Sequence, residues 1–185
     1  MSEADKKKWN QKYKERTNDI TLPSPTPILK ELTPMLHGKY ALDIACGLGG
    51  NSVYLTQLGF FVTAWDVSDV AIHYLQDLSI KHELAIKTEV KDLDVFLEVN
   101  DSFDLVVDTF YLNRPLFPQI KKLVKPGGLF LMHTFSLTDS QANTHISDQY
   151  KLQPCELKNI FSEWEILYFN QNEKDGLQSI LACKK

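Results

Sequence analysis

The sequence contains only three cysteines, Cys46, Cys155 and Cys183, which lie far apart and form no CxxC pair. This spacing argues against a zinc site and a disulfide framework, and favours reduced thiols in a cytoplasmic protein. No run of about 18 apolar residues is present, so no membrane span is expected. The N-terminal Met-Ser-Glu-Ala-Asp-Lys-Lys-Lys is followed by no apolar stretch, which predicts that it is not a signal peptide.

The chain also lacks a large excess of positive or negative charge. Its 185 residues include 20 basic and 24 acidic side chains, a formal net charge of −4. This balance argues mildly against nucleic-acid binding driven by bulk charge. The five histidines have no metal-ligand spacing, so no metal is expected. We therefore expect a small-molecule partner, no nucleic acid or membrane, and a monomer or homodimer.

One shift in composition suggests a boundary between an N-terminal segment and the main domain. Residues 20–27 hold three prolines and predict a semi-rigid segment after a short N-terminal helix at about 6–16. We expect residues 1–27 to form this helix and Pro-rich cap, and 28–185 a single domain. Within that domain, apolar residues repeat at helical spacing over 28–36.

Beyond residue 38, apolar strands alternate with helical patterns, which predicts an α/β fold with a mostly parallel sheet covered on both faces. The last two strands are joined by the tight Asn172-Glu173-Lys174-Asp175-Gly176, which reads as a hairpin and makes one strand antiparallel. A polar stretch over 136–153 is expected to be a long loop. The expected strands are 39–45, 60–66, 84–90, 103–109, 129–135, 164–169 and 177–183, and the helices are 50–58, one that Ser68 caps, 114–124 and 155–162.

A glycine-rich turn follows the first strand. Asp43 lies near the strand end, Gly47 and Gly49 form the turn, and Asp66 ends the second strand. This pattern is typical of a nucleoside-cofactor pocket at the carboxyl ends of parallel strands, with Asp66 on the ribose hydroxyls. A tight βα turn and a helix-capping acid are the structural alternatives. Asp43 favours a cationic cofactor over a pyrophosphate.

A third acid, Asp92, follows the third strand and precedes Leu93. A carboxylate there can accept a hydrogen bond from an adenine amine while Leu93 packs on the ring. A solvated turn aspartate explains Asp92 equally well.

Together these motifs resemble class I S-adenosylmethionine-dependent methyltransferases. Asp43-Ile-Ala-Cys-Gly-Leu-Gly-Gly is similar to that family's first motif, and Asp66, Asp92-Leu93, Phe103–Asp108 and Leu123–Gly128 follow in its order. The match covers about residues 39–135 and implies a Rossmann-like, doubly wound, seven-stranded sheet. Ala45 departs from the family's usual glycine, a mild change where the local φ is negative.

Local strings resemble a narrower group, the tellurite-resistance methyltransferases of the TehB type. These strings are Trp9-Asn10-Gln11-Lys12-Tyr13, Asn51–Leu55, Val62–Asp66, Tyr111–Arg114 and Leu181–Lys185. The resemblance implies a methyltransferase acting on a small molecule, such as a thiol or a chalcogen oxyanion like tellurite.

The resemblance also implies roles for individual residues. The helix face with Trp9, Tyr13 and Arg16 is expected to close over S-adenosyl-L-methionine, with Arg16 facing its carboxylate or the substrate; two aromatics packing on the body are the alternative. Asp108, Arg114 and His133 are the catalytic candidates at the substrate side. The cofactor-binding candidates are Trp9, Tyr13, Arg16, Asp43, Ala45, Cys46, Gly47, Gly49, Asn51, Asp66, Val67, Asp92, Leu93 and Asp108.

Two other functions stay open from the sequence. An NAD(P)-dependent oxidoreductase fits a glycine turn, but the third glycine of GxGxxG is missing and Asp43 stands beside the turn. A non-catalytic S-adenosylmethionine-binding module also fits, because methyl transfer requires no fixed set of catalytic residues.

Overall fold

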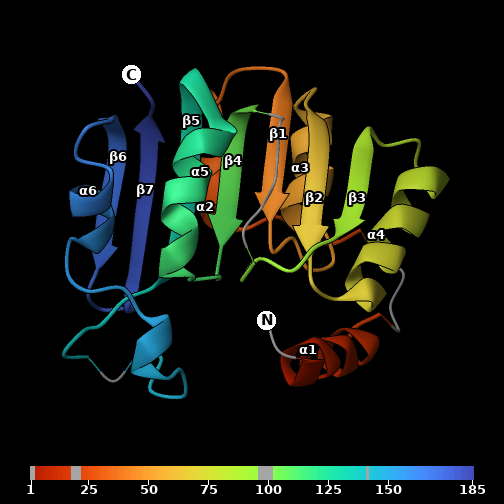
Figure 1. Cartoon of the computed structure of the whole chain (residues 1–185), viewed down its shortest axis with the longest axis horizontal. Helices are drawn as coiled ribbons and strands as arrows, with labels where there is room; N and C mark the ends of the chain where they lie inside the picture. Colours follow the sequence, from red (N-terminus) through yellow and green to blue (C-terminus); the bar gives the residue numbers. More distant parts are fainter. Residues whose placement is uncertain (1–2, 18–21, 96–101, 141) are drawn as a thin grey trace. The chain divides into compact units, whose positions relative to one another are not determined.

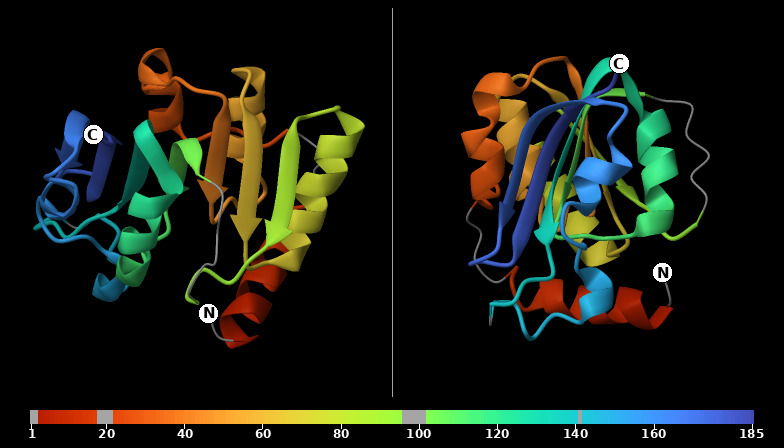
Figure 2. Two further views of the ribbon diagram at one scale, coloured as in Figure 1. Left: turned by 45° about the horizontal axis from the view of Figure 1, so that its top comes forward. Right: turned by 90° about the vertical axis from the view of Figure 1, so that its left-hand side faces the viewer.

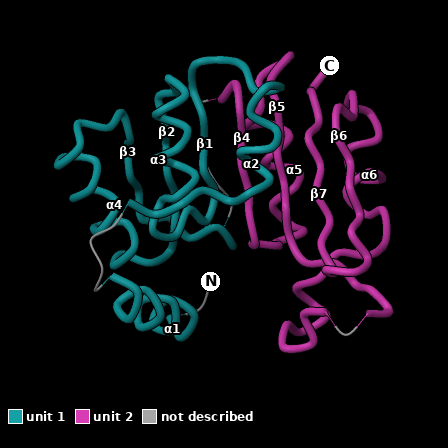
Figure 3. The backbone as a smooth tube through the Cα atoms, turned by 180° about the vertical axis from the view of Figure 1, so that it is seen from behind, with its two compact units in different colours: residues 1–98 teal, residues 99–185 magenta. Residues whose placement is uncertain are grey.

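The computed structural model describes residues 3–17, 22–95, 102–140 and 142–185. Residues 20–21 of the Pro-rich segment and 96–100 lie outside the described residues. The chain divides into two compact units, residues 1–98 and 99–185 (Figure 3). The boundary expected after residue 27 stays a prediction.

The first unit is a parallel α/β layer whose strands run in the order β3-β2-β1. Helix α3 packs against β1 and β2, and α4 packs against β2 and β3. Buried apolar residues such as Leu42, Val53 and Leu75 form its core. The elements are α1 (Glu3–Lys14), α2 (Pro27–Glu31), β1 (Tyr40–Ile44), α3 (Gly50–Gln57), β2 (Phe61–Asp66), α4 (Asp69–Lys81) and β3 (Ile86–Val90).

Helix α1 of this unit buries none of its residues and packs on α4. In Figures 1 and 2 the arrowheads of β1 and β2 point towards the end of the unit where α1 lies. The helix is therefore placed at the carboxyl ends of these strands, where α/β proteins bind ligands.

The second unit has the strand order β4-β5-β7-β6, and β7 runs antiparallel to both of its neighbours. Helices α5 and α6 cover one face of these strands (Figure 2). Phe130 and Phe161 pack at 4.9 Å between ring centroids in its core. The elements are β4 (Phe103–Thr109), α5 (Phe117–Leu123), β5 (Val124–Phe135), α6 (Glu156–Ile160), β6 (Glu165–Asn172) and β7 (Leu177–Cys183).

The predicted fold class is confirmed: an α/β, Rossmann-like, seven-stranded and mostly parallel sheet with one antiparallel strand in a C-terminal hairpin. Several boundaries differ. Helix α1 ends at Lys14, two residues before the predicted end. The helix expected over 114–124 is divided into a 3-10 turn, Arg114–Leu116, and α5. Residues 124–128 belong to β5, and a register shift in the pairing with β4 accommodates them.

Candidate cofactor and acceptor sites

The turn between β1 and α3 has an unusual backbone. Ala45, Gly47 and Gly49 all have positive φ, at 52°, 54° and 84°. Alanine replaces the family's glycine at little cost only where φ is negative. Ala45 does not meet this condition. The left-handed conformation strains a residue with a Cβ by roughly 1–2 kcal/mol. The strain is retained directly beside the acids of this site, which is where strained backbone tends to occur.

Replacing Ala45 by glycine is expected to stabilise the protein. Glycine removes the strain but loses roughly 0.5–1 kcal/mol of backbone entropy, so the net gain is up to about 1.5 kcal/mol. Urea unfolding measures it. Glu83→Gly is the matched control because Glu83 is exposed and has φ 53°. A loss of stability in Ala45→Gly alone would contradict the strain interpretation.

Asp66 is buried at the end of β2 and organises the turn. Its Oδ2 accepts a hydrogen bond from the Gly47 backbone N–H at 2.9 Å, and its Oδ1 accepts from the Ser68 N–H at 2.8 Å. Burial raises the pKa of Asp66, and these backbone hydrogen bonds limit the rise. Each carboxylate oxygen has two lone pairs, so both keep capacity to accept from a ligand hydroxyl.

Asp43 is the more isolated acid. It is buried in β1, and its Oδ2 accepts from Ser52 Oγ at 2.6 Å. Its Oδ1 has no hydrogen-bond partner among the described residues. Burial raises the pKa of Asp43 to about 7, with a smaller contribution from Asp66. A buried carboxylate oxygen without a donor is costly, and a cationic ligand group would relieve that cost.

Tyr13 from α1 lies over the glycine turn. A Cβ built on Gly47 would approach the Tyr13 hydroxyl oxygen to 2.9 Å. Burial raises the pKa of Tyr13, and the nearby Asp66 raises it further. Trp9 stacks on Tyr13 at 5.8 Å between ring centroids. Arg16 is exposed and lies in the turn that follows α1, so its place on one helical face with Trp9 and Tyr13 stays a prediction.

Polar contacts attach α1 to the start of α4. Asn10 Oδ1 accepts from Ser68 Oγ at 2.6 Å, and Asn10 Nδ2 donates to Asp69 Oδ1 at 2.8 Å. Ser68 caps α4, as predicted, by accepting from the Ala71 N–H at 3.1 Å. Lys6 adds an ion pair to Asp69 at 3.2 Å. Helix α1, which carries Tyr13, is thus attached to Ser68, whose backbone N–H also donates to Asp66.

The other cofactor candidates of the first unit differ in their surroundings. Asn51 accepts from Thr26 N–H and Oγ1, at 2.9 and 3.0 Å, and so anchors the Pro-rich segment. Val67 and Leu93 are buried. Asp92 accepts from the Asp94 N–H at 2.9 Å, which is a turn contact. Burial raises the pKa of Cys46, so its thiol stays protonated.

In the second unit, Asp108 is buried near the carboxyl end of β4. Phe110 follows it at φ 60° and is 46% exposed. Its ring makes a T-shaped pair with His133 of β5, with centroids 5.1 Å apart, and its centroid is 5.3 Å from that of Phe135. His133 Nδ1 is hydrogen-bonded to Ser179 Oγ of β7 at 2.7 Å. The ends of β4 and β5 therefore present a histidine among aromatic rings.

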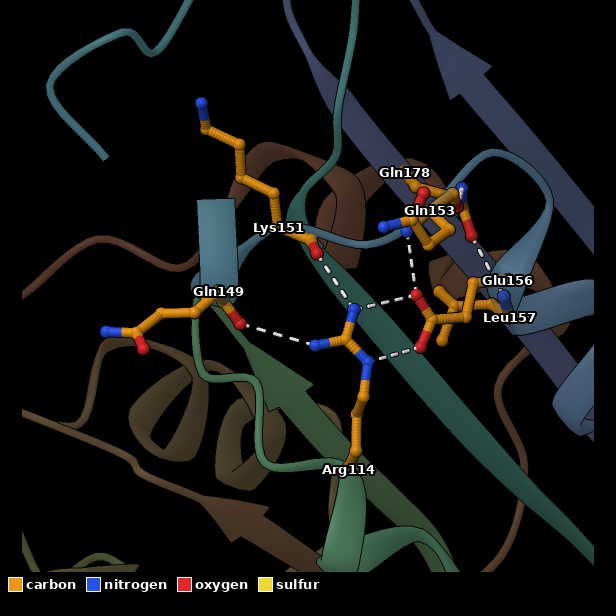
Figure 4. Close-up of polar contacts among 7 residues, drawn as sticks. All are labelled: Arg114, Gln149, Lys151, Gln153, Glu156, Leu157 and Gln178. Carbon is orange, nitrogen blue, oxygen red and sulfur yellow. Dashed lines mark hydrogen bonds and ion pairs between the residues drawn. The ribbon is translucent and has the colours of Figure 1, made fainter. Parts of the chain in front are cut away.

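Arg114 is engaged in a cluster of polar contacts (Figure 4). Its Nε and Nη2 donate to the two carboxylate oxygens of Glu156 at 2.6 and 2.8 Å. Further donors reach the carbonyl oxygens of Lys151, at 2.9 Å, and Gln149, at 3.2 Å. Gln178, fully buried, accepts from the Leu157 N–H at 3.0 Å. These contacts favour a role for Arg114 in holding residues 149–157, and its catalytic role stays a prediction.

Substitution of Arg114 by alanine is expected to lower the free energy of unfolding by roughly 1–3 kcal/mol, because it leaves Glu156 without its charged donor. Urea unfolding measures the loss, and amide exchange localises it to 149–157. Glu156→Gln is the matched variant. If the pair acts only as a clamp, both variants lose turnover similarly; a far larger loss for Arg114→Ala would support direct action on the acceptor.

Sequence reasoning missed four residues: Asn10, Ser52, Glu156 and Ser179. Asn10 and Ser52 lie within motifs quoted above, but nothing in spacing shows that Ser52 donates to Asp43 or that Asn10 bonds to Ser68. Ser179 lies directly opposite His133 in the β5–β7 register. The pairing of β5 with β7, which the strand patterns did not predict, is the only signal that points to it.

The family model described as tellurite resistance protein TehB matches residues 7–178, nearly the whole chain. The chain belongs to the TehB family. This confirms the predicted resemblance to methyltransferases of the TehB type.

The chain is also similar to individual known proteins. A probable S-adenosyl-L-methionine-dependent methyltransferase TehB from Haemophilus influenzae is 33% identical over 138 residues, covering 71% of this chain and 48% of the relative. The crystal structure of TehB from that organism has a TM-score of 0.78 at 24% identity, covering 96% of this chain and 67% of the other. A SAM-dependent methyltransferase from Aquifex aeolicus has a TM-score of 0.70 at 17% identity, covering 95% and 98%. The chain spans about half the length of its curated TehB relatives.

Two other kinds of feature are absent from the described part of the chain. No helix among the described residues is long and apolar enough to cross a membrane. Within the same residues, no group of three or more His, Cys, Asp or Glu side chains is placed to hold a metal ion.

Proposed function

We propose that this chain transfers the methyl group of S-adenosyl-L-methionine to a small molecule. The observation that carries this proposal is the buried Oδ1 of Asp43, which has no donor among the described residues. The cofactor's α-amino group is a cationic donor of the kind that this oxygen requires. Asp66 would hold the ribose hydroxyls, with Asp92 and Leu93 as candidates for the adenine. When bound, the cofactor supplies an already activated methyl carbon.

The two buried acids weigh against an NAD(P)-dependent oxidoreductase. Asp43 and Asp66 both lie beside the glycine turn, and Asp66 already accepts a hydrogen bond from the Gly47 N–H at 2.9 Å. Backbone N–H groups of such a turn are what a pyrophosphate needs, and nearby carboxylates repel its charge. A cationic cofactor does not need these N–H groups, and the carboxylates do not repel it.

Helix α1 is proposed to cover the cofactor through Trp9 and Tyr13, with Arg16 at the cofactor's carboxylate. Arg16 is exposed and near Tyr13, whose pKa its charge lowers against the larger effects of burial and Asp66. Arg16→Ala is expected to weaken binding of S-adenosylmethionine about 10-fold, because Arg16 is exposed and its hydrogen bond should lie at the lower end of the roughly 1.5–3 kcal/mol that a charge-assisted bond contributes. Lys14→Ala, an exposed cation at the end of the same helix, is the control. Unchanged affinity and turnover in Arg16→Ala would rule out this role.

The acceptor side is proposed at the ends of β4 and β5, with Asp108, Arg114 and His133 as candidate catalytic residues. Alignment of the acceptor and exclusion of water supply most of the rate enhancement that such a transfer needs. The proposed acceptors are thiols and chalcogen oxyanions such as tellurite, in keeping with the family's name.

Radiolabelled methyl transfer tests the proposal. Purified protein is incubated with labelled S-adenosylmethionine and tellurite, selenite, dithiothreitol or a simple amine. We expect transfer to a thiol or an oxyanion. If the cofactor binds but no acceptor is methylated, the non-catalytic binding module becomes the better account.

The setting of the reaction is part of the proposal. The three cysteines are free, which fits a reducing cytoplasm. The net charge of −4 fits a small-molecule acceptor better than nucleic acid. A monomer or homodimer is proposed.

A further inference from the structure

His133 is fixed from two sides. It lies opposite Ser179 in the antiparallel β5–β7 pair, where facing side chains share one surface of the sheet. The Ser179 hydroxyl is 2.7 Å from Nδ1. The half-exposed Phe110 ring packs against the imidazole in a T-shaped arrangement, and the Phe110 N–H donates to the His133 carbonyl oxygen at 2.8 Å. The ring is thus held in one orientation.

The direction of the hydrogen bond between the Ser179 hydroxyl and His133 Nδ1 determines the tautomer of His133. Ser179 is only 4% exposed, and within the described part of the chain its hydroxyl makes one hydrogen bond, to His133 Nδ1. If Nδ1 carried the proton and donated it, the hydroxyl hydrogen would have no acceptor among those residues. A buried donor left unsatisfied costs about 1–3 kcal/mol. The hydroxyl therefore donates to an unprotonated Nδ1, and the neutral ring carries its proton on Nε2.

We propose that Ser179 is a positioning residue that fixes His133 as the Nε2–H tautomer, so that His133 acts towards the methyl acceptor as a hydrogen-bond donor and not as a base. The statement about the acceptor rests on the proposed function, whereas the tautomer does not. A donor at this place suits an acceptor that is already anionic, such as a thiolate or an oxyanion.

The electron balance agrees with this acceptor class. A lone pair of the acceptor forms the bond to the methyl carbon, the carbon–sulfur bond of the sulfonium breaks, and its electron pair stays on sulfur. An anionic acceptor loses one unit of negative charge in this step, so no proton has to pass to His133. Neutral acceptors such as amines would need a base elsewhere.

Nuclear magnetic resonance tests the tautomer directly in the ligand-free protein. Long-range ¹H–¹⁵N spectra distinguish Nε2–H from Nδ1–H, and a His133→Gln variant assigns the signals among the five histidines. Above the titration of the ring, we expect the Nε2–H pattern, with Nδ1 shifted as a hydrogen-bond acceptor. Ser179→Ala should remove that shift and Ser179→Thr should restore it. An Nδ1–H pattern in the wild type would overturn the proposal.

Turnover tests the positioning role. Ser179→Ala is expected to lower kcat for the methylated acceptor, dithiothreitol or selenite, roughly 10- to 100-fold through misplacement of the ring. Ser179→Thr should recover most of it, and the affinity for S-adenosylhomocysteine should stay within twofold. Full turnover in Ser179→Ala would overturn the positioning role. If S-adenosylhomocysteine fails to bind the wild type, the proposed function fails instead, and the tautomer is still decided by the spectra.

Discussion

Asp43→Asn is expected to lose most of the affinity for S-adenosylmethionine. The variant keeps the shape of the side chain and a partner for Ser52, but it replaces the charge on a buried oxygen that has no other donor among the described residues. A hydrogen bond to a charged group contributes about 1.5–3 kcal/mol, so the Kd should rise roughly 10- to 150-fold. Isothermal titration calorimetry measures this change.

The same substitution is expected to stabilise the ligand-free protein above pH 7. The pKa of Asp43 is about 7 in the folded protein, against an ordinary value of 3.8. Between these values the native state binds a proton that the unfolded state does not. The free energy of unfolding therefore falls as pH rises from about 4 to about 7 and then levels off. The amide of the Asp43→Asn variant does not titrate, so this slope should be smaller in the variant.

Cofactor binding should show the matching pH dependence in the wild type. A protonated Asp43 cannot pair with an ammonium group, so affinity should fall as pH drops below about 7. Asp77→Asn, which removes an exposed carboxylate from α4, is the control for a general charge effect. If Asp43→Asn binds the cofactor as tightly as the wild type, or is less stable at pH 8, the role given to Asp43 is wrong.

Gly49→Ala is expected to destabilise the protein strongly. Gly49 has φ 84°, and a Cβ there would lie 2.3 Å from Leu75 Cδ1. The backbone strain costs roughly 1–2 kcal/mol, and overpacking against a core leucine adds roughly 1–3 kcal/mol. Urea unfolding should therefore show a loss of roughly 2–5 kcal/mol.

Two variants separate these contributions. Gly59 has φ 90° with nothing within 4 Å of a built Cβ, so Gly59→Ala measures the strain alone. Leu75→Ala makes room for the new methyl group, so the double variant should lose less stability than the sum of the two single variants. Equal losses in Gly49→Ala and Gly59→Ala, or strict additivity with Leu75→Ala, would contradict the packing argument.

The sequence was sufficient where local patterns determine structure. Alternating apolar strands and helical repeats predicted every strand, because buried parallel strands leave continuous apolar runs. The cap at Ser68 and the left-handed Gly59 after α3 were also predictable, since both depend on residue type at helix ends.

Other features depend on contacts that spacing does not encode. Ala45 has a positive φ although its residue type predicts a negative one, because the turn around it determines the backbone. Arg114 was assigned to catalysis from its position after β4, whereas Glu156, 42 residues away, takes two of its donors. Ser179 meets His133 only through the register of an antiparallel pair.

The central claim is that the acids around the glycine turn form a site for a sulfonium cofactor. Calorimetric titration of the wild type with S-adenosylmethionine, S-adenosylhomocysteine and NAD tests it most directly. The account predicts binding of the first two, weakened together in Asp43→Asn, and no binding of NAD. Binding of NAD without binding of S-adenosylhomocysteine would contradict it.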